Sequence, residues 1–412
     1  MKPSSHDKPA AVVIGLDSMQ GIQTARILRR HRIPVIAVAS DREHPCCRTN
    51  TCQEIRFADT GGEELVTTLL EIAARQARKP VLVPCQDKCV RTVSRHRDLL
   101  SQHFTIVLPP AAVVELLMDK ISFLEHAQRH GLRVPATFVL RARADALQAA
   151  AQLPFPCLLK PAYRSAEWDR QTKQKVYMVA SAQELIEVYD KCHKWADSLV
   201  AQQWVEGDDA SLYSCNCYFG ARGEPLVTFV ARKLRQWPPE AGSSCLGEEV
   251  RDDVVRDATL ALFATVPYRG LAYLEMKKDS RTGDYYMIEP NIGRPTGRSA
   301  IAEAGGVELV YTMYCDAAGL PLPANRTQKY TGARWVDLRH DFQSAFYYWR
   351  RGRLTLWQWF RSWRGRKAHA IFSWRDPAPF LCDVKKALTL GLAKRLRRRR
   401  NASTLAHSPR EA

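Results

Sequence analysis

The chain has 412 residues, enough for two or three domains and for a core that needs no disulfide bonds. Its 46% hydrophobic and 25% charged content excludes a disordered chain. The net charge of +18 comes mainly from residues 350–412, where 17 Lys or Arg stand against 3 Asp or Glu. No apolar run reaches eighteen residues and no secretory signal pattern is present, so we expect a cytoplasmic protein.

The first 110 residues alternate short apolar runs with helical stretches. The apolar runs occupy residues 11–14, 34–39, 79–84 and 105–108. This alternation predicts a parallel sheet with helices on both faces. Gly15 and Gly21 follow the first run but lack the GxGxxG spacing, so we predict a tight turn there rather than an NAD site. Two prolines at 109–110 mark the end of this first domain, residues 1–110.

Residues 111–325 mix helices with strands that are expected to pair antiparallel. We predict a helix over 113–130, a strand over 155–160, strand-like segments over 200–230, a hairpin over 271–291 and a helix over 299–318. After residue 323 the composition shifts to Trp, Tyr and Arg. Residues 326–412 therefore form a basic, aromatic-rich C-terminal extension, and we expect its end to be disordered.

The sharpest chemical signal is the hairpin over 271–291. Its turn sequence, residues 279–283, places Glu275 about opposite Glu289, and alternation along the strand puts Asn291 on the same face. Two facing carboxylates repel each other unless a cation lies between them. Two carboxylates and an amide oxygen are hard donors that suit Mg²⁺, with Mn²⁺ as the second choice.

The same hairpin allows another interpretation, a solvated edge in which Glu275 pairs with Lys277 or Lys278. On the opposite face we expect an apolar set that joins the core: Leu274, Met276, Tyr286 and Ile288. The twelve cysteines show no paired CxxC spacing, so we expect reduced thiols without a metal role.

Further candidate residues suit a nucleotide. Lys120 begins a helix and Lys160 ends an apolar strand, where an unpaired charge is costly to bury, so a phosphate is a suitable partner. Ordinary surface lysines are the alternative. The extended segment 200–209 offers main-chain groups to an adenine edge, and Asp208 or Asp209 could accept from ribose hydroxyls, although a polar turn explains it equally well.

Three basic residues suit the chemistry of a carboxylate substrate. Lys233 and Arg235 lie on what we predict to be a Pro-bounded loop, within reach of an acid substrate or a γ-phosphate, with a solvated loop as the alternative. Arg294, three residues past Asn291, is suited to stabilise charge on the carboxylate or on a tetrahedral intermediate.

In this order, the pieces resemble the ATP-grasp superfamily over roughly residues 10–320, most of all the branch of carboxylate–amine ligases that includes D-aspartate ligase. The stretches that carry the resemblance are 12–21, 119–120, 131–135, 155–161, 202–209, 233–239, 275 and 289–294. It implies an α/β and α+β fold: a Rossmann-like pre-ATP-grasp domain, then a two-lobed ATP-grasp domain with a small lid lobe over about 135–205.

The resemblance also implies roles for the candidate residues. Lys120 and Lys160 would bind the phosphates, and the main chain of Gln203, Trp204 and Val205 would bind adenine. Asp208 or Asp209 would bind ribose. Mg²⁺ would be bound by Glu275, Glu289 and Asn291. The implied reaction uses ATP to activate a carboxylate as an acyl phosphate, which an amine attacks to form an amide. Which acid and which amine are used, and the oligomeric state, do not follow from the sequence.

One departure concerns the lid. Residues 162–176, where this superfamily usually carries a Gly-rich phosphate loop, contain no glycine. Side chains of Arg164, Arg170, Lys173 or Lys175 could substitute for main-chain contacts. The missing glycines favour an alternative from another class, a non-catalytic ATP-binding regulator or scaffold recruited to a membrane surface. A second alternative is a carboxylate ligase with another nucleophile.

The tail carries two stripes of large apolar residues among Arg and Lys. The first is Leu356, Trp359, Phe360 and Trp363, and the second is Val384, Leu388, Leu392 and Leu396. Such segments suit an anionic membrane surface at the inner face of the membrane. Nucleic acid is a weaker rival because no nucleic-acid motif accompanies the arginines. A C-terminal packing element with a solvated end explains the stripes equally well.

Overall fold

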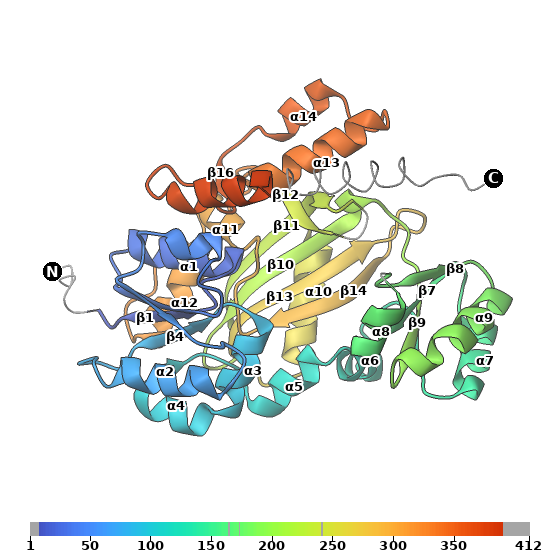
Figure 1. Cartoon of the computed structure of the whole chain (residues 1–412), viewed down its shortest axis with the longest axis horizontal. Helices are drawn as coiled ribbons and strands as arrows, with labels where there is room; N and C mark the ends of the chain where they lie inside the picture. Colours follow the sequence, from blue (N-terminus) through green and yellow to red (C-terminus); the bar gives the residue numbers. More distant parts are fainter. Residues whose placement is uncertain (1–7, 164, 173, 240–241, 390–412) are drawn as a thin grey trace, which may run out of the picture.

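The computed structural model describes residues 8–163, 165–172, 174–239 and 242–389, which form three sheets with helices around them (Figure 1). Arg164 and Lys173 of the Gly-free stretch lie outside the described residues. So do Leu392 and Leu396, together with the chain end that we expected to be disordered.

The first sheet is parallel, with its five strands in the order β3-β2-β1-β4-β5. Its elements are β1 (Ala11–Ile14), α1 (Met19–Arg30), β2 (Val35–Ala39), η2 (Pro45–Arg48), β3 (Glu54–Phe57), α2 (Glu63–Ala73), β4 (Val81–Pro84), α3 (Asp87–Arg95), α4 (Arg97–His103) and β5 (Thr105–Ile106). This order is that of a doubly wound sheet, which confirms the predicted parallel architecture. The sequence pattern missed β3, because Glu54 and Arg56 interrupt its apolar residues.

The predicted tight turn after the first strand is present. Gly15 has a φ of +90°, and a Cβ atom on Gly21 would lie 2.3 Å from the carbonyl oxygen of Gly15. The two glycines therefore allow α1 to begin directly against the end of β1.

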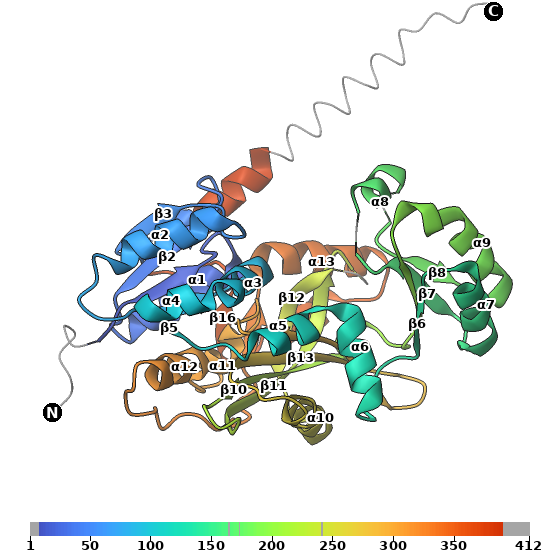
Figure 2. The same cartoon turned by 90° about the horizontal axis from the view of Figure 1, so that it is seen from below.

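The second sheet is antiparallel, in the order β6-β9-β7-β8. Its elements are β6 (Thr137–Leu140), α7 (Arg143–Gln152), β7 (Cys157–Pro161), α8 (Ala166–Gln171), β8 (Tyr177–Val179), α9 (Ala182–Cys192), η3 (His193–Trp195) and β9 (Leu199–Gln203). It has its own core, which includes the fully buried Trp168 and Leu159. Both views show this green lobe standing at one end of the molecule (Figures 1 and 2).

The third sheet has seven strands in the order β14-β13-β10-β11-β12-β15-β16. Its strands are β10 (Leu212–Phe219), β11 (Pro225–Trp237), β12 (Ser243–Glu249), β13 (Gly270–Lys278), β14 (Tyr285–Ile292), β15 (Arg334–Val336) and β16 (Lys367–His369). The helices with it are α5 (Ala111–Met118), α6 (Lys120–Arg129), η4 (Asp209–Ser211), α10 (Asp253–Ala264), α11 (Ala300–Ala304), α12 (Leu309–Ala317), α13 (Leu338–Arg350) and α14 (Leu356–Ser362). Its pairs are antiparallel except for β15 with β16.

Two helices that we predicted as continuous are each broken. The helix expected over 113–130 ends at Met118, and Asp119 then caps α6 by accepting from the Ser122 N–H at 2.8 Å. The helix expected over 299–318 is interrupted at Gly305 and Gly306, where Gly306 has a φ of +81°. In both cases a residue with a strong local preference outweighs the apolar periodicity.

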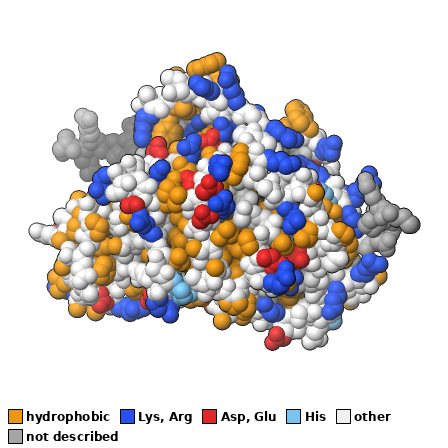
Figure 3. Space-filling view, turned by 180° about the vertical axis from the view of Figure 1, so that it is seen from behind, with side chains coloured by type: hydrophobic (Ala, Val, Ile, Leu, Met, Phe, Trp, Pro, Cys, Tyr) orange, Lys and Arg blue, Asp and Glu red, His pale blue; other side chains and the backbone are white. Residues whose placement is uncertain are grey.

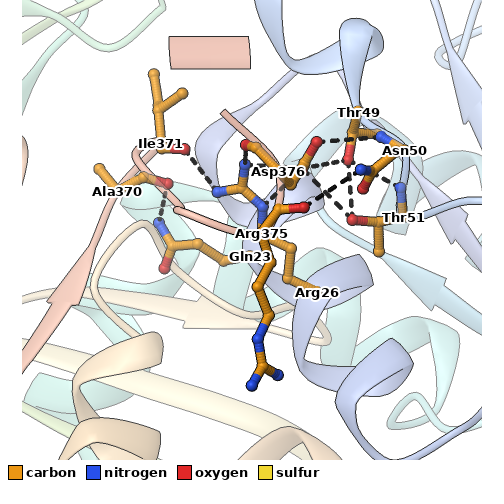
Figure 4. A network of polar contacts seen from close by, with 9 residues as sticks. All are labelled: Gln23, Arg26, Thr49, Asn50, Thr51, Ala370, Ile371, Arg375 and Asp376. Carbon is orange, nitrogen blue, oxygen red and sulfur yellow. Dashed lines mark hydrogen bonds and ion pairs between the residues drawn. The ribbon is translucent and has the colours of Figure 1, made fainter. Parts of the chain in front are cut away.

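The C-terminal extension is built into the main sheet. Its strand β15 pairs with β12, with Leu246 opposite Val336, and β16 then adds to the edge. Arg26 of α1 forms a buried ion pair with Asp376, whose carboxylate also accepts from Thr49 (Figure 4). No helix in the described part of the chain is long and apolar enough to cross a bilayer.

Candidate active site

The two hairpin carboxylates face each other, as the sequence predicts. Glu275 of β13 is the direct cross-strand partner of Glu289 of β14, and Asn291 lies two residues further along the same strand. Neither carboxylate oxygen of Glu289 has a hydrogen-bond partner among the described residues, so this group is available to a ligand. The hairpin thus presents two carboxylates and one amide together.

The predicted apolar set on the other face is only partly correct. A bulge between Glu275 and Met276 shifts the register, so Met276 pairs with Met287. Tyr286 and Ile288, which strict alternation would place in the core, are therefore only partly buried. The core takes Leu274, Met276 and Met287.

Glu275 is held by an arginine and a tyrosine rather than by a lysine. The Tyr273 hydroxyl and Arg298 Nη2 each donate to Glu275 Oε2 at 3.3 Å. Lys277 and Lys278 instead lie over the rings of Trp204 and Tyr285, with their Nζ atoms 4.0 and 5.1 Å from the ring centroids. The interpretation of a solvated edge, with Glu275 paired to a neighbouring lysine, is therefore wrong.

A cavity of about 90 Å³ brings Lys120, Lys160 and Glu289 together between α6, β7 and β14. The Nζ atom of Lys160 donates to Gln202 Oε1 at 3.1 Å. Burial lowers the pKa of Lys160 to about 8, and the charge of Lys120 lowers it too, while Glu289 raises it. The walls of the cavity desolvate Glu289 and raise its pKa, while Lys120 lowers it. An anion in this cavity would lie near both ammonium groups.

The segment after β9 lies beside this cavity and is partly engaged within the lobe. The Gln203 N–H donates to the Ala136 carbonyl at 2.8 Å, and the Trp204 N–H donates to the Pro156 carbonyl at 3.3 Å. The N–H of Val205 has no hydrogen-bond partner among the described residues. Of the three main-chain N–H groups that we assigned to adenine, Val205 alone is therefore available.

The two aspartates of the following turn differ in their surroundings. Asp208 is exposed, and its Oδ1 accepts from the Ala210 N–H at 2.9 Å. Asp209 is buried and accepts from Gln236 Nε2 at 2.6 Å and from the Tyr348 hydroxyl at 2.8 Å. Asp208 is thus the one that can reach a ligand from solvent, whereas Asp209 connects the turn to α13.

Lys233 and Arg235 lie in β11, which corrects the predicted loop. Lys233 is buried, and its Nζ donates to Gln236 Oε1 at 3.1 Å. Burial lowers the pKa of Lys233, and the nearby carboxylate of Glu275 raises it. Arg235 instead forms a buried ion pair with Asp341 of α13, at 2.8 and 3.1 Å. Lys233 therefore lies on the side of the hairpin that presents Glu275, which we call the carboxylate face. Arg235 instead links β11 to the C-terminal extension.

Arg294 connects the hairpin to the first sheet. Its Nε donates to Asp87 Oδ1 at 2.5 Å and its Nη2 to Asp87 Oδ2 at 3.1 Å. The same Nη2 donates to Asn291 Oδ1 at 2.5 Å. Asp87 is the first residue of α3, so the first sheet contributes a charged group to this site.

Sequence reasoning missed Arg298, Tyr273 and Asp87. Arg298 is buried, donates to the Tyr273 hydroxyl as well as to Glu275, and its Nη1 has no partner among the described residues. Tyr273 could have been found, because it lies two residues before Glu275 on the same face of the strand. Asp87 comes from a distant segment and Arg298 from the turn after the hairpin, and neither carries a local signal.

The donor set fits a divalent cation. In the described part of the chain no three His, Cys, Asp or Glu residues gather around one point, so the amide oxygen of Asn291 would complete the set of Glu275 and Glu289. Carboxylate and amide oxygens are what Mg²⁺ and Mn²⁺ prefer. The facing carboxylates and the unpartnered oxygens of Glu289 fit such an ion.

The Gly-free stretch of the smaller lobe forms the short helix α8. Trp168 of this helix is fully buried, and its Nε1 donates to the Gln174 carbonyl at 2.9 Å. Arg170 pairs with Glu167 on the same helix, and Lys175 is exposed. An anchored helix therefore takes the place of a flexible glycine loop.

Comparisons with known proteins give relatives at low identity. No protein-family model matches the chain. It is 24% identical over 250 residues to D-aspartate ligase from Enterococcus faecium, covering 57% of this chain and 58% of that one. It is 30% identical over 97 residues to D-alanine–D-alanine ligase from Pseudomonas putida, covering 24% and 29%. The chain thus spans little more than half of the first relative and less of the second.

Solved structures show the same fold at low identity. N5-carboxyaminoimidazole synthetase from Staphylococcus aureus has a TM-score of 0.61 at 16% identity, over 80% of this chain and 82% of that one. The biotin carboxylase–β,γ-ATP complex from Campylobacter jejuni has a TM-score of 0.63 at 15% identity, over 80% and 75%. A biotin carboxylase domain from Hydrogenobacter thermophilus, with MgADP bound, has a TM-score of 0.60 at 14% identity, over 78% and 72%.

The parallel first sheet, the antiparallel second sheet, the largely antiparallel third sheet and these solved structures together show an ATP-grasp fold. At low identity, the chain is similar to a D-aspartate ligase and to D-alanine–D-alanine ligases.

Proposed function

We propose that this protein is an ATP-dependent carboxylate–amine ligase that works through an acyl phosphate. The observation that carries the proposal is the cross-strand pair of Glu275 and Glu289, which lies beside the cavity of Lys120 and Lys160. The related ligases and the ATP-grasp fold support it. Such a site places metal ligands and phosphate ligands next to each other, as phosphoryl transfer requires.

In this reaction a substrate carboxylate oxygen attacks the γ-phosphorus of ATP, the bond to the β-phosphate oxygen breaks and ADP leaves. The amine nitrogen then attacks the acyl carbon, phosphate leaves, and the nitrogen loses a proton. When bound by Glu275, Glu289 and Asn291, Mg²⁺ would neutralise charge on the phosphates. The protein supplies no nucleophile of its own, and its contribution is to position groups and to balance charge.

The candidate residues that can reach a ligand then have defined tasks. Lys160 and Lys120 hold phosphate oxygens, and the Val205 N–H and Asp208 are the contacts available to adenine and ribose. Lys233 and Arg298 lie on the carboxylate face, where cations stabilise an acid substrate and the charge that develops during attack. Because an acyl phosphate hydrolyses readily, the smaller lobe must keep water from the site.

The test is phosphate release from Mg-ATP by the full-length protein with a panel of acids and amines that includes D-aspartate and D-alanine. A ligase releases ADP and phosphate only when the correct acid is present. Production of AMP and pyrophosphate would refute the acyl-phosphate step. No turnover with tight ATP binding would instead indicate the regulator or scaffold that the Gly-free stretch favours.

Glu289→Gln is the informative variant. It removes one metal-binding charge without changing size, so we expect phosphate release to fall by about a hundredfold or more. Glu115→Gln, on the exposed face of α5, is the matched control and should keep normal turnover. Equal turnover in both variants would contradict the assignment of Glu289 as a metal ligand.

A further inference from the structure

The helices α13 and α14 carry an unusual concentration of exposed apolar side chains. Six of the fifteen large hydrophobic side chains that are exposed in the described part of the chain lie between residues 342 and 360. They are Phe342, Phe346 and Trp349 on α13 and Leu356, Trp357 and Phe360 at α14. We call these six residues the aromatic face. Monomeric soluble proteins rarely leave so many such side chains together in water.

Two tryptophans fix α14 to α13 beneath the aromatic face. Trp359 and Trp363 turn inward, and their Nε1 atoms donate to Asp341 Oδ2 at 3.0 and 2.8 Å. The predicted stripe of Leu356, Trp359, Phe360 and Trp363 is therefore divided, with the two tryptophans half-buried and the other two residues exposed. The exposed side chains are thus not left over from loose packing, because the inward residues already hold the helix.

An apolar groove of about 200 Å³ runs between the two helices. Its walls include Phe342, Phe346, Trp349 and Leu356, all of them residues of the aromatic face. Figure 3 shows hydrophobic and basic side chains gathered together at the top of the molecule, where α13 and α14 lie. The face therefore stands at an extremity of the molecule, where a flat partner can reach it.

The charge around the aromatic face is strongly positive. Residues 338–375 contain nine Lys or Arg against a single Asp, and that aspartate is buried. Arg350, Arg361 and Arg364 form no ion pair with another described residue. Two of these arginines lie over rings of the aromatic face. The Cζ atom of Arg350 is 6.0 Å from the ring centroid of Phe346, and that of Arg364 is 5.8 Å from the ring centroid of Trp357.

The positive charge determines which kind of partner can bind to the aromatic face. A second copy of the chain would bring two arginine-rich surfaces together, which repel each other. The segment 390–412 of this chain is itself rich in arginine, so it would be repelled as well. An anionic partner is attracted, and a mixture of Trp, Phe and Arg is the composition that enters the boundary between lipid headgroups and acyl chains.

A second amphipathic element adjoins the face. Residues 378–389 are helical, and Leu381 and Leu388 are exposed on this helix. It is fixed to α13 by the ion pair of Arg339 Nε with Asp383 Oδ2, at 2.8 Å. Lys385 and Lys386 on the same helix extend the positive surface.

We infer that the aromatic face docks on an anionic lipid bilayer, with its rings in the headgroup boundary and its arginines on lipid phosphates. The observation that carries this inference is the set of six exposed side chains on a fixed, arginine-rimmed pair of helices. The inference is independent of the proposed ligase activity.

The test is sedimentation of the full-length protein with vesicles of phosphatidylcholine alone or with 30% phosphatidylglycerol. We expect binding to the anionic vesicles that is at least about tenfold tighter and that weakens at high salt. Trp357→Ser with Phe360→Ser should weaken it by about tenfold, because both rings leave the boundary. The matched control, Leu147→Ser with Met178→Ser, changes two exposed hydrophobic residues of the smaller lobe and should bind normally.

Charge variants complete the test. Arg361→Ser with Arg364→Ser should abolish the preference for phosphatidylglycerol, while Arg95→Ser with Arg222→Ser, on other surfaces, should keep it. If serine at 397–400 removes all vesicle binding while the Trp357 and Phe360 variant has no effect, the inference is wrong. The inference is also wrong if wild-type protein does not bind the vesicles and the Trp357 and Phe360 variant converts a dimer to a monomer in sedimentation velocity.

Discussion

Lys160 shows how one partly buried charge can set the pH range of the site. Its ammonium group lies in the cavity with Lys120 and Glu289, and burial lowers its pKa to about 8. A bound phosphate needs the protonated form. In the free protein this form is complete well below pH 8 and is lost as the pH rises through that value.

We therefore expect the affinity for Mg-ATP to fall between pH 7 and pH 9. Lys160→Arg keeps its charge over this range, so its affinity should change little with pH even if it is lower overall. Nucleotide titration at several pH values measures both. A wild-type affinity that is constant up to pH 9 would show that Lys160 does not contact the phosphates.

At the same scale, the sequence predicted the pairing of Glu275 with Glu289, because a short turn and strict alternation fix which residues face each other. It did not predict the bulge after Glu275, which depends on the packing of Met287. Arg298 and Asp87 were also missed, since each reaches the site from a separate segment. Local sequence patterns identify residues that are neighbours on one strand or hairpin. They do not identify residues that only the tertiary fold brings together.

The element that connects the site to the C-terminal extension is α13. Its buried Asp341 accepts from Arg235 Nε at 2.8 Å and from the indole groups of Trp359 and Trp363. Its Tyr348 donates to Asp209 at the other end of the helix. One helix thus fixes two of the residues that the sequence assigned to ligand binding.

Asp341→Asn should destabilise the fold strongly. It leaves the buried guanidinium of Arg235 without a counter-charge, which typically costs about 3–5 kcal/mol. Asp190→Asn breaks the exposed pair with Arg143 and should cost less than about 1 kcal/mol. Chemical denaturation of both variants measures the free energy of unfolding. Equal midpoints would mean that α13 is not anchored by this ion pair.

The sequence placed the regular elements better than their ends. Apolar periodicity located four of the five parallel strands and the hairpin, yet it ran through Asp119 and through Gly305 and Gly306, where helices stop. The loop predicted around Lys233 and Arg235 was inferred from Pro238 and Pro239, which instead follow the end of β11. The domain limits at 110 and 325 stay predictions.

At the scale of the whole molecule, the first sheet takes part in the site through Asp87. This aspartate is the partner of Arg294, which in turn donates to Asn291 on the hairpin. The position of an expected metal ligand therefore depends on a residue from another sheet.

Asp87→Asn should raise the Mg²⁺ concentration needed for half-maximal phosphate release, because Arg294 then interacts more strongly with Asn291. We also expect a loss of about 1–2 kcal/mol in the free energy of unfolding. Asp59→Asn, an exposed aspartate of the same unit near Lys88, is the control. An unchanged Mg²⁺ requirement would mean that Asp87 has no part in the metal face.

The insertion of β15 between β12 and β16 has a practical result for anyone who shortens this protein. A fragment that stops near residue 325, the predicted end of the ATP-grasp domain, would leave β12 as an exposed edge strand, which is prone to aggregation. Arg26 and Arg235 would also lose their ion-pair partners Asp376 and Asp341. The predicted ATP-grasp domain therefore cannot be separated from the C-terminal extension at residue 325, because the last strands and helices are part of its main sheet and its packing.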